Sequence, residues 1–86
     1  MKLGMVGLGK MGGNMALRLR DKGHEVVGYD FDPQVSDVGS LAELVGRLEA
    51  PRTVWLMVPA GEPTAGAVAE LGGLLGAGDL VIDGGN

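Results

Sequence analysis

The stretch GLGKMGG at residues 7–13 directly follows the apolar run LGMV at residues 3–6. Ordering four glycines in seven positions costs much conformational entropy, because glycine loses more conformational freedom on folding than any other residue. Gly7, Gly9 and Gly12 have the spacing G-x-G-x-x-G, which is typical of a tight turn from a strand into a helix beside a bound diphosphate. In a chain with 17 glycines, this motif carries weight only in a matching context.

Four runs of continuous apolar character predict β-strands. Continuous apolar character, as opposed to alternation, is typical of parallel strands that are buried on both faces. The four runs are residues 3–6, 25–29, 53–58 and 80–82. The first run ends directly before the glycine-rich stretch, as the turn motif requires.

Helical patterns fill the intervals between these runs. The pattern at 11–22 ends before Gly23, which can adopt the left-handed conformation of a helix C-cap. Ser40 and Glu43 have the spacing of a capping box, and Pro63 suits a first helical turn. The predicted core-facing stripes of the three helices are Met11, Met15, Ala16 and Leu19; Leu41, Leu44, Val45 and Leu48; and Val68, Leu71, Leu74 and Leu75.

Strands and helices alternate along the whole chain, which predicts an α/β fold of Rossmann type: an open parallel sheet with helices on both faces. In this fold Gly7 would allow the turn, Gly9 the approach of a diphosphate to the backbone, and Gly12 the close packing of helix on sheet. The N–H groups at the start of that helix, at the positive end of its dipole, are suited to hold phosphate oxygens.

Composition limits the possible functions. A chain of 86 residues with 45% hydrophobic content predicts a single domain over residues 1–86. The net charge of −4 and the pI near 4.7 argue against a nucleic-acid partner. The absence of cysteine excludes disulfides, thiolate catalysis and cysteine-ligated zinc, and no metal site is predicted. No apolar run reaches the roughly 18 residues of a membrane span, so we expect a cytoplasmic protein without a membrane partner.

Asp30 closes the second apolar run, 18 positions after Gly12. At this place in a dinucleotide-binding fold, an acidic side chain accepts hydrogen bonds from the ribose hydroxyls of the adenosine half. The alternative is a solvated turn residue, because Asp32 and Pro33 also have turn character.

The charge of Asp30 also bears on the choice of cofactor. A carboxylate at about 4 Å from a 2′-phosphate would repel it by about 4 kcal/mol per unit charge at an effective dielectric constant near 20. Neither Phe31 nor Asp32 offers a compensating cation. We therefore expect NAD in preference to NADP, unless Arg47 or Arg52 lies within range.

Longer stretches of the chain resemble one enzyme family. GLGKMGGNMALRL at 7–19, KGHEVVGYD at 22–30, VWLMVPAG at 54–61 and IDGGN at 82–86 look like the cofactor domain of 6-phosphogluconate dehydrogenases. The wider β-hydroxyacid dehydrogenase superfamily shares the first two stretches but does not usually share the IDGGN ending. The resemblance covers nearly the whole chain.

The resemblance implies a set of cofactor-binding residues. The glycine-rich turn would surround the pyrophosphate, with Lys10 either at a phosphate or as a solvated loop lysine. Asn86 would lie beside the nicotinamide ribose and touch a sugar-acid phosphate substrate. The implied cofactor-binding residues are Gly7, Leu8, Gly9, Lys10, Met11 and Gly12 at the pyrophosphate; Asp30, Phe31 and Asp32 at the adenosine ribose; and Val58, Pro59, Ala60 and Asn86 along the nicotinamide half.

The family reaction is the oxidative decarboxylation of 6-phosphogluconate to ribulose 5-phosphate in the pentose phosphate pathway, with NAD(P) as the hydride acceptor. In the family, a helical domain after the position of Asn86 supplies the catalytic lysine and glutamate. We therefore expect this chain to be a segment of a longer, homo-oligomeric enzyme and to hold no catalytic residue itself. Two alternatives are the cofactor domain of a 3-hydroxyisobutyrate-type dehydrogenase and a non-catalytic, nucleotide-sensing regulatory domain.

The chain departs from the family pattern between Pro33 and Ser40. Only QVSDVG, residues 34–39, stands where the family usually carries a further helix and a short strand. The segment is either naturally short, or shortened by an engineered deletion, or shortened by a gap in the sequence where a disordered segment is left out. We favour the deletion or the gap, because loss of a strand would leave an open sheet edge.

Overall fold

The alternation of strands and helices predicted from the sequence is confirmed by a computed structural model, which describes residues 2–57 and 62–84. The predicted strands agree with the observed ones to within one or two residues, with Val58 outside the described residues. The elements, in chain order, are β1 (Lys2–Val6), α1 (Lys10–Asp21), β2 (Glu25–Tyr29), α2 (Leu41–Gly46), β3 (Thr53–Leu56), α3 (Glu62–Leu74) and β4 (Leu80–Asp83).

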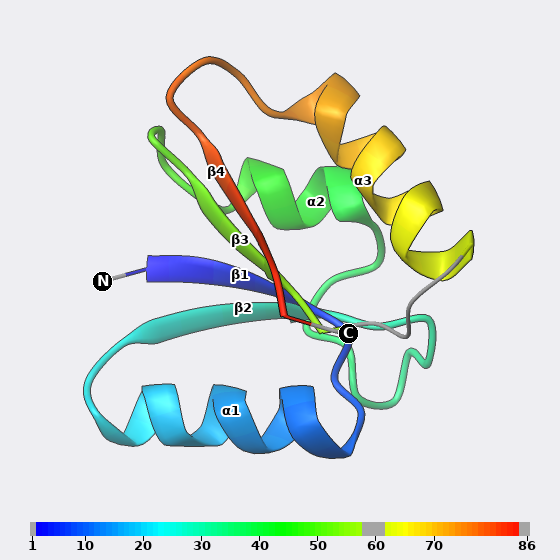
Figure 1. Cartoon of the computed structure of the whole chain (residues 1–86). Helices are drawn as coiled ribbons and strands as arrows, with labels where there is room; N and C mark the ends of the chain where they lie inside the picture. The colour runs from blue at the N-terminus through cyan, green and yellow to red at the C-terminus, as the bar shows by residue number, and fades with distance from the viewer. Residues whose placement is uncertain (1, 58–61, 85–86) are drawn as a thin grey trace.

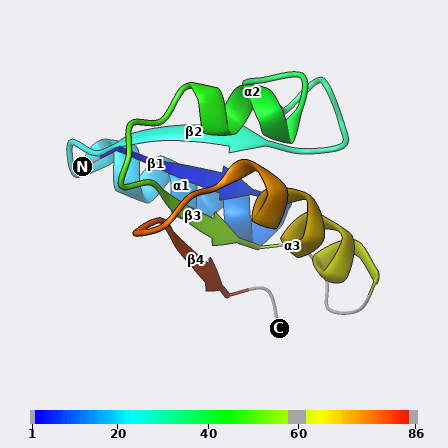
Figure 2. The ribbon, with the colours of Figure 1, turned by 90° about the horizontal axis from the view of Figure 1, so that it is seen from above.

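The four strands form one parallel sheet in the order β2-β1-β3-β4. α1 covers one face of this sheet, while α2 and α3 lie on the other (Figure 1). β2 and β4 are the outer strands, as the view from above shows (Figure 2). This arrangement confirms the predicted open α/β sheet. Because all strands are parallel, the loops that follow them meet at one edge of the sheet.

Two hydrophobic clusters lie on the two faces of the sheet. On the side of α1, fully buried Met5 packs with Leu3, Ala16 and Val26. The cluster on the side of α2 and α3 consists of Val6, Val38, Leu41, Leu44, Val45, Leu48, Val54, Leu56 and Leu71. β1 is buried on both faces, which explains its continuous apolar run. The outer strand β4 differs from the expectation, because its Leu80 and Val81 are exposed.

The helix termini follow the predicted chemistry with one change. Gly23 has φ = +90°, the left-handed conformation expected after α1. Ser40 Oγ accepts a hydrogen bond from the Glu43 N–H at 3.0 Å and so caps α2. In a capping box, the Glu43 carboxylate would accept a hydrogen bond from the N–H of Ser40 itself. Here it accepts from the N–H of the preceding residue, Gly39, at 3.0 Å.

Two residues of the predicted stripes do not face the core. Met11 is 72% exposed, because at about 100° per residue it lies about 140° around α1 from buried Ala16. Val68 is 46% exposed, and Ala67 packs against the core from α3 instead. The other stripe residues are buried or partly buried. The prediction of contact with the core is therefore wrong only for Met11 and Val68, which lie at the margins of the helical faces.

Residues 30–40 contain neither a helix nor a strand, which confirms the predicted shortening between the second and third strands. β2 is therefore the outer strand on this side. Its outer edge is not open, however, because side chains of Arg20, Ser36 and Asp37 occupy it. The argument that a naturally short segment would leave an open sheet edge is therefore wrong.

Asp79 ties the start of β3 to the turn before β4. Its Oδ1 accepts from the Arg52 N–H at 2.5 Å, and its Oδ2 accepts from the Gly76 N–H at 2.8 Å and from Arg52 Nη1 at 3.2 Å. The hydrogen bond from the Arg52 N–H, followed by that from Gly76 and the Arg52 guanidinium, holds the pKa of Asp79 below its ordinary value.

This lowered pKa makes the stability of the domain sensitive to acid. The contribution of Asp79 is fully present above the ordinary aspartate pKa of about 3.9 and is lost as the pH falls through the lower folded-state pKa. We expect Asp79→Asn to lower the melting temperature at pH 7 and to flatten its decline between about pH 4 and pH 2. Circular dichroism melts of both proteins across this range test the prediction. Parallel pH profiles would contradict it.

Candidate functional site

The chain turns sharply at Gly7, directly after β1. Gly7 has φ = +96°, which L-residues with a side chain rarely adopt, as the predicted tight turn requires. Its N–H donates to the Tyr29 carbonyl at 2.8 Å and so joins the start of the loop to the end of β2. The glycine-rich turn thus begins where β1 and β2 end.

Gly12 lies in the first turns of α1, against the backbone of the same loop. A Cβ at this position would collide with the carbonyl oxygen of Gly7 and lie 3.2 Å from Cβ of Met57. Gly12 is also buried. The close packing predicted for the third glycine of the motif is therefore confirmed.

Gly9 differs from Gly12 in its surroundings. A Cβ built on Gly9 would have no heavy atom within 4 Å, so the space in front of this residue is open in the described part of the chain. Gly9 is the N-cap of α1, no side chain caps the helix by a hydrogen bond, and its first turn holds no acidic residue. The N-terminus of α1 therefore presents N–H groups and a partial positive charge to an open space. Lys10 is exposed next to it.

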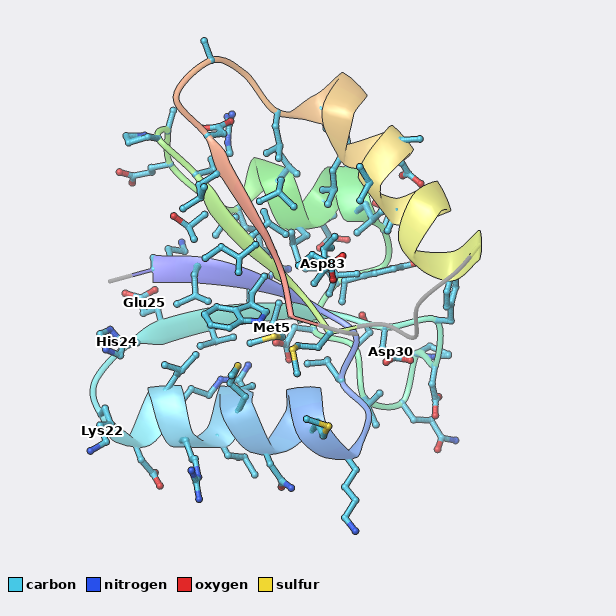
Figure 3. All side chains as sticks on the ribbon, in the orientation of Figure 1. Met5, Lys22, His24, Glu25, Asp30 and Asp83 are labelled. Carbon is cyan, nitrogen blue, oxygen red and sulfur yellow. The ribbon has the colours of Figure 1, made fainter. Side chains whose placement is uncertain are left out.

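Asp30 faces this turn from the end of β2 (Figure 3). Its Oδ2 accepts from the Leu8 N–H at 2.7 Å, and its Oδ1 accepts from the Asp32 N–H at 2.9 Å. Its own N–H donates to Ser36 Oγ at 3.1 Å. The carboxylate is half-buried and fixed to the loop, in contrast to a solvated turn residue. A carboxylate offers about four lone-pair sites, so both oxygens can accept further hydrogen bonds.

The two residues after Asp30 extend toward solvent. The ring of Phe31 is 81% exposed and meets Tyr29 edge to face at a centroid distance of 6.1 Å. Asp32 Oδ1 accepts from the Gln34 N–H at 3.0 Å and so forms a local turn. Phe31 therefore presents an apolar ring beside Asp30.

Neither arginine considered as a partner for a 2′-phosphate lies near Asp30. Arg47 pairs with Glu43 at 2.9 Å on α2. Arg52 pairs with Asp79 at 3.2 Å. It precedes β3 and so lies at the N-terminal ends of the strands, whereas Asp30 lies at their C-terminal ends. The condition that would favour NADP is thus not met by either residue.

A hollow of about 600 Å³ lies between α1 and the segment after β2. Leu8 and Gly9 line it from the loop and Lys10 from the first residue of α1, while Val35 and Asp37 line it from the segment. Arg20 also reaches it from α1 and pairs with Asp37 at 2.8 Å. Arg20 is a basic residue in the last turn of α1. Its pairing depends on an irregular segment that no periodicity describes.

The predicted residues of the nicotinamide half, Val58, Pro59, Ala60 and Asn86, lie outside the described residues. The structure does describe the backbone that leads toward them, at Met57 and Gly84. The Met57 N–H donates to the Val6 carbonyl at 2.7 Å, and the Gly84 N–H donates to the Leu56 carbonyl at 2.9 Å. The chain thus leaves β3 and β4 at the edge of the sheet that carries the glycine-rich turn and Asp30.

Residues 2–57 and 62–84 contain neither a cluster of metal-ligating side chains nor a membrane-spanning helix. No group of three or more His, Asp or Glu side chains there could hold a metal ion. No helix in the same ranges is long and apolar enough to cross a membrane.

Comparison with known proteins shows the family to which the chain belongs. The family model described as "NAD binding domain of 6-phosphogluconate dehydrogenase" matches residues 2–86. An NAD(+)-dependent, decarboxylating 6-phosphogluconate dehydrogenase of Haloferax volcanii is 41% identical over 95 aligned positions, which cover 100% of this chain and 32% of that protein. The enzyme of the same description from Bacillus subtilis is 36% identical, and the decarboxylating enzyme of Drosophila melanogaster is 35% identical. Each of these two alignments covers 98% of this chain, and they cover 21% and 20% of the relatives.

The chain thus spans a third to a fifth of the length of these relatives. The alignments also extend over 95 to 98 positions, more than the 86 residues of the chain, so the relatives carry residues that this chain lacks. This difference agrees with a shortened segment after β2.

Proposed function

The chain belongs to the family of NAD-binding domains of 6-phosphogluconate dehydrogenase, and from this membership we propose that it is the cofactor domain of an enzyme that oxidatively decarboxylates 6-phosphogluconate. The product would be ribulose 5-phosphate. NAD is the cofactor named for the family and for the archaeal and the bacterial relative described above. All three of those relatives are named for 6-phosphogluconate, which favours this substrate over 3-hydroxyisobutyrate.

The open space at Gly9 is the observation that carries the proposal. A diphosphate needs backbone N–H groups that no side chain covers, at the positive end of a helix. Gly9 and the N-terminus of α1 provide such groups, while Gly7 and Gly12 fix the path of the chain around them. The residues present therefore fit the pyrophosphate of NAD.

We further propose that Asp30 binds the adenosine ribose and selects NAD over NADP. Its carboxylate is already oriented by the N–H groups of Leu8 and Asp32. A preoriented acceptor loses little entropy when it binds a hydroxyl group. Phe31, which is exposed beside it, supplies an apolar surface for the adenosine half.

In the parent enzyme, this domain would hold and orient the cofactor without moving a proton. Bound NAD would accept a hydride from C3 of the sugar acid. Val58, Pro59, Ala60 and Asn86 would lie along the nicotinamide half, with Asn86 also touching the substrate. A separate region would supply the acid and the base. We propose a homo-oligomeric, cytoplasmic enzyme.

The proposal is tested by Gly9→Ala. Gly9 has φ = −66° and ψ = −164°, which alanine can adopt, and its Cβ would meet no protein atom. We expect an unchanged melting temperature and a loss of NAD affinity of at least about tenfold, because the methyl group would occupy the space of the pyrophosphate. Isothermal titration calorimetry with NAD measures this loss.

Gly46→Ala is the matched control for this test. Gly46 lies in α2, and a Cβ there would also have no heavy atom within 4 Å. NAD affinity should therefore stay at the wild-type value. If Gly9→Ala bound NAD as tightly as the wild type, the pyrophosphate would not lie at this turn.

A further inference from the structure

β2 is an outer strand whose inner side pairs with β1. The Tyr29 carbonyl accepts from the Gly7 N–H toward β1. Because peptide groups alternate in direction along a strand, Val26, Gly28 and Asp30 direct theirs away from β1. Such an outward row of N–H and C=O groups is a template for pairing with another chain.

The outward row is nevertheless occupied by the protein itself. Arg20 Nη2 donates to the Val26 carbonyl at 2.8 Å. The Gly28 N–H donates to Asp37 Oδ2 at 2.9 Å, and the Asp37 N–H donates to the Gly28 carbonyl at 2.9 Å. Asp37 therefore bonds both peptide groups of Gly28, as a residue on a neighbouring strand would.

The segment that supplies these groups is anchored to α1, to β2 and to the core through residues 36–38. Arg20 Nη2 donates to Asp37 Oδ2 at 2.8 Å, which joins the segment to α1. Ser36 Oγ donates to the Val38 carbonyl at 2.6 Å, and Val38 is buried in the cluster beneath α2. Ser36 Oγ also accepts from the Asp30 N–H at 3.1 Å, so the same hydroxyl group reaches the end of β2.

We propose that Arg20, Ser36 and Asp37 form an edge clamp that replaces a neighbouring strand and positions Asp30 for the nucleotide. The path is short. Ser36 holds the Asp30 N–H, and the Asp30 carboxylate holds the Leu8 N–H at the glycine-rich turn. The three clamp residues are positioning residues. Their effect on a ligand rests on the proposed function, whereas their effect on the edge of β2 does not.

The alternative is a surface ion pair without consequence. Arg20 and Asp37 each have 41% of their side chain exposed, and an exposed ion pair alone contributes little to stability. A bare ion pair, however, would not require Asp37 to bond both peptide groups of Gly28. The two interpretations therefore differ in what happens to the backbone of β2 when Asp37 is changed.

Hydrogen exchange of the backbone amides separates the two interpretations. In Asp37→Ala, we expect the Gly28 and Asp30 amides to exchange at least about tenfold faster by NMR, while the amides of β1 keep their rates. Asp37→Asn retains a carbonyl oxygen as acceptor and should restore slow exchange at Gly28. Arg47→Ala, which removes an exposed ion pair of 2.9 Å on α2, is the matched control and should change neither amide.

Ligand discrimination tests the positioning of Asp30. ADP and 2′-deoxy-ADP differ only in the 2′-hydroxyl, one of the two ribose hydroxyls that Asp30 is proposed to bind. We expect the ratio of their affinities to fall at least about threefold in Asp37→Ala and to stay constant in Arg47→Ala. A purely structural loss would weaken both nucleotides equally and leave the ratio unchanged.

The outcomes separate the edge clamp from the proposed function. The clamp would be overturned if Asp37→Ala changed neither the exchange rates of the Gly28 and Asp30 amides nor the ratio of the two nucleotide affinities. If the wild type bound no ADP, the proposed function would fail, and the exchange rates would still decide the clamp. If Asp37→Ala did not fold, Ser36→Ala would take its place: faster exchange of the Asp30 amide alone would support the clamp, and unchanged exchange would overturn it.

Discussion

Gly12→Ala should destabilise the fold by about 1–3 kcal/mol, the usual range for overpacking a buried site. The added methyl group would collide with the carbonyl oxygen of Gly7, which is backbone and cannot rotate away. For a domain of this size, the melting temperature should fall by roughly 4–24 °C. NAD affinity should fall as well, because relief of the collision displaces the turn from α1. Thermal melts by circular dichroism and titration with NAD measure the two effects.

Gly72→Ala is the control for this substitution. Gly72 lies in α3, and a Cβ there would have no heavy atom within 4 Å. Alanine should therefore stabilise the helix by about 0.5–1 kcal/mol. A wild-type melting temperature in Gly12→Ala would show that the turn and α1 can separate without loss, which would contradict the close packing described above.

Gly9→Ala and Gly12→Ala together separate two requirements of one motif. At Gly12 the added methyl group would meet protein, and at Gly9 it would meet open space. Gly12→Ala should therefore reduce both stability and affinity, and Gly9→Ala should reduce affinity alone. The glycine motif in the sequence does not show whether a glycine is needed for packing within the protein or for the approach of a ligand. The atoms around a Cβ added at each position distinguish these two requirements.

The fold could be predicted largely because its signals are local. Parallel strands buried on both faces leave continuous apolar runs, and Gly23 and Ser40 mark helix ends through their own conformation or hydrogen bonds. The position of Asp30 at the end of β2 followed from the order of strand and turn. The incorrect positions, Met11 and Val68, lie at the margins of helical faces, where periodicity alone does not determine contact with the core.

The contacts of the edge clamp could not be predicted in the same way. Arg20 and Asp37 are separated by β2 and by a segment that has neither helical nor strand periodicity. Their contact depends on how residues 31–39 fold back along β2, and this path is set by tertiary packing of Val38. The loss of a strand could be read from the sequence, but the side chains that cover the resulting edge could not.

Asp30→Ala should reduce the preference for NAD over NADP at least about tenfold. The carboxylate would repel a 2′-phosphate at about 4 Å by about 4 kcal/mol at an effective dielectric constant near 20. Arg47 and Arg52 pair elsewhere and do not offset this repulsion. NAD itself should bind more weakly, because the ribose loses an acceptor and the Leu8 N–H loses its partner. Titration of the variant with both cofactors gives the ratio.

Asp30→Asn separates the charge of this residue from its role in the loop. Asparagine keeps one carbonyl oxygen, which can accept from the Leu8 N–H, but it carries no charge and presents an NH₂ group on its other side. The cofactor preference should therefore fall as in Asp30→Ala, while the melting temperature should stay closer to that of the wild type. If both variants kept the preference for NAD but lost stability, Asp30 would hold the loop without contacting the ribose. The selection of NAD would then have to come from other residues.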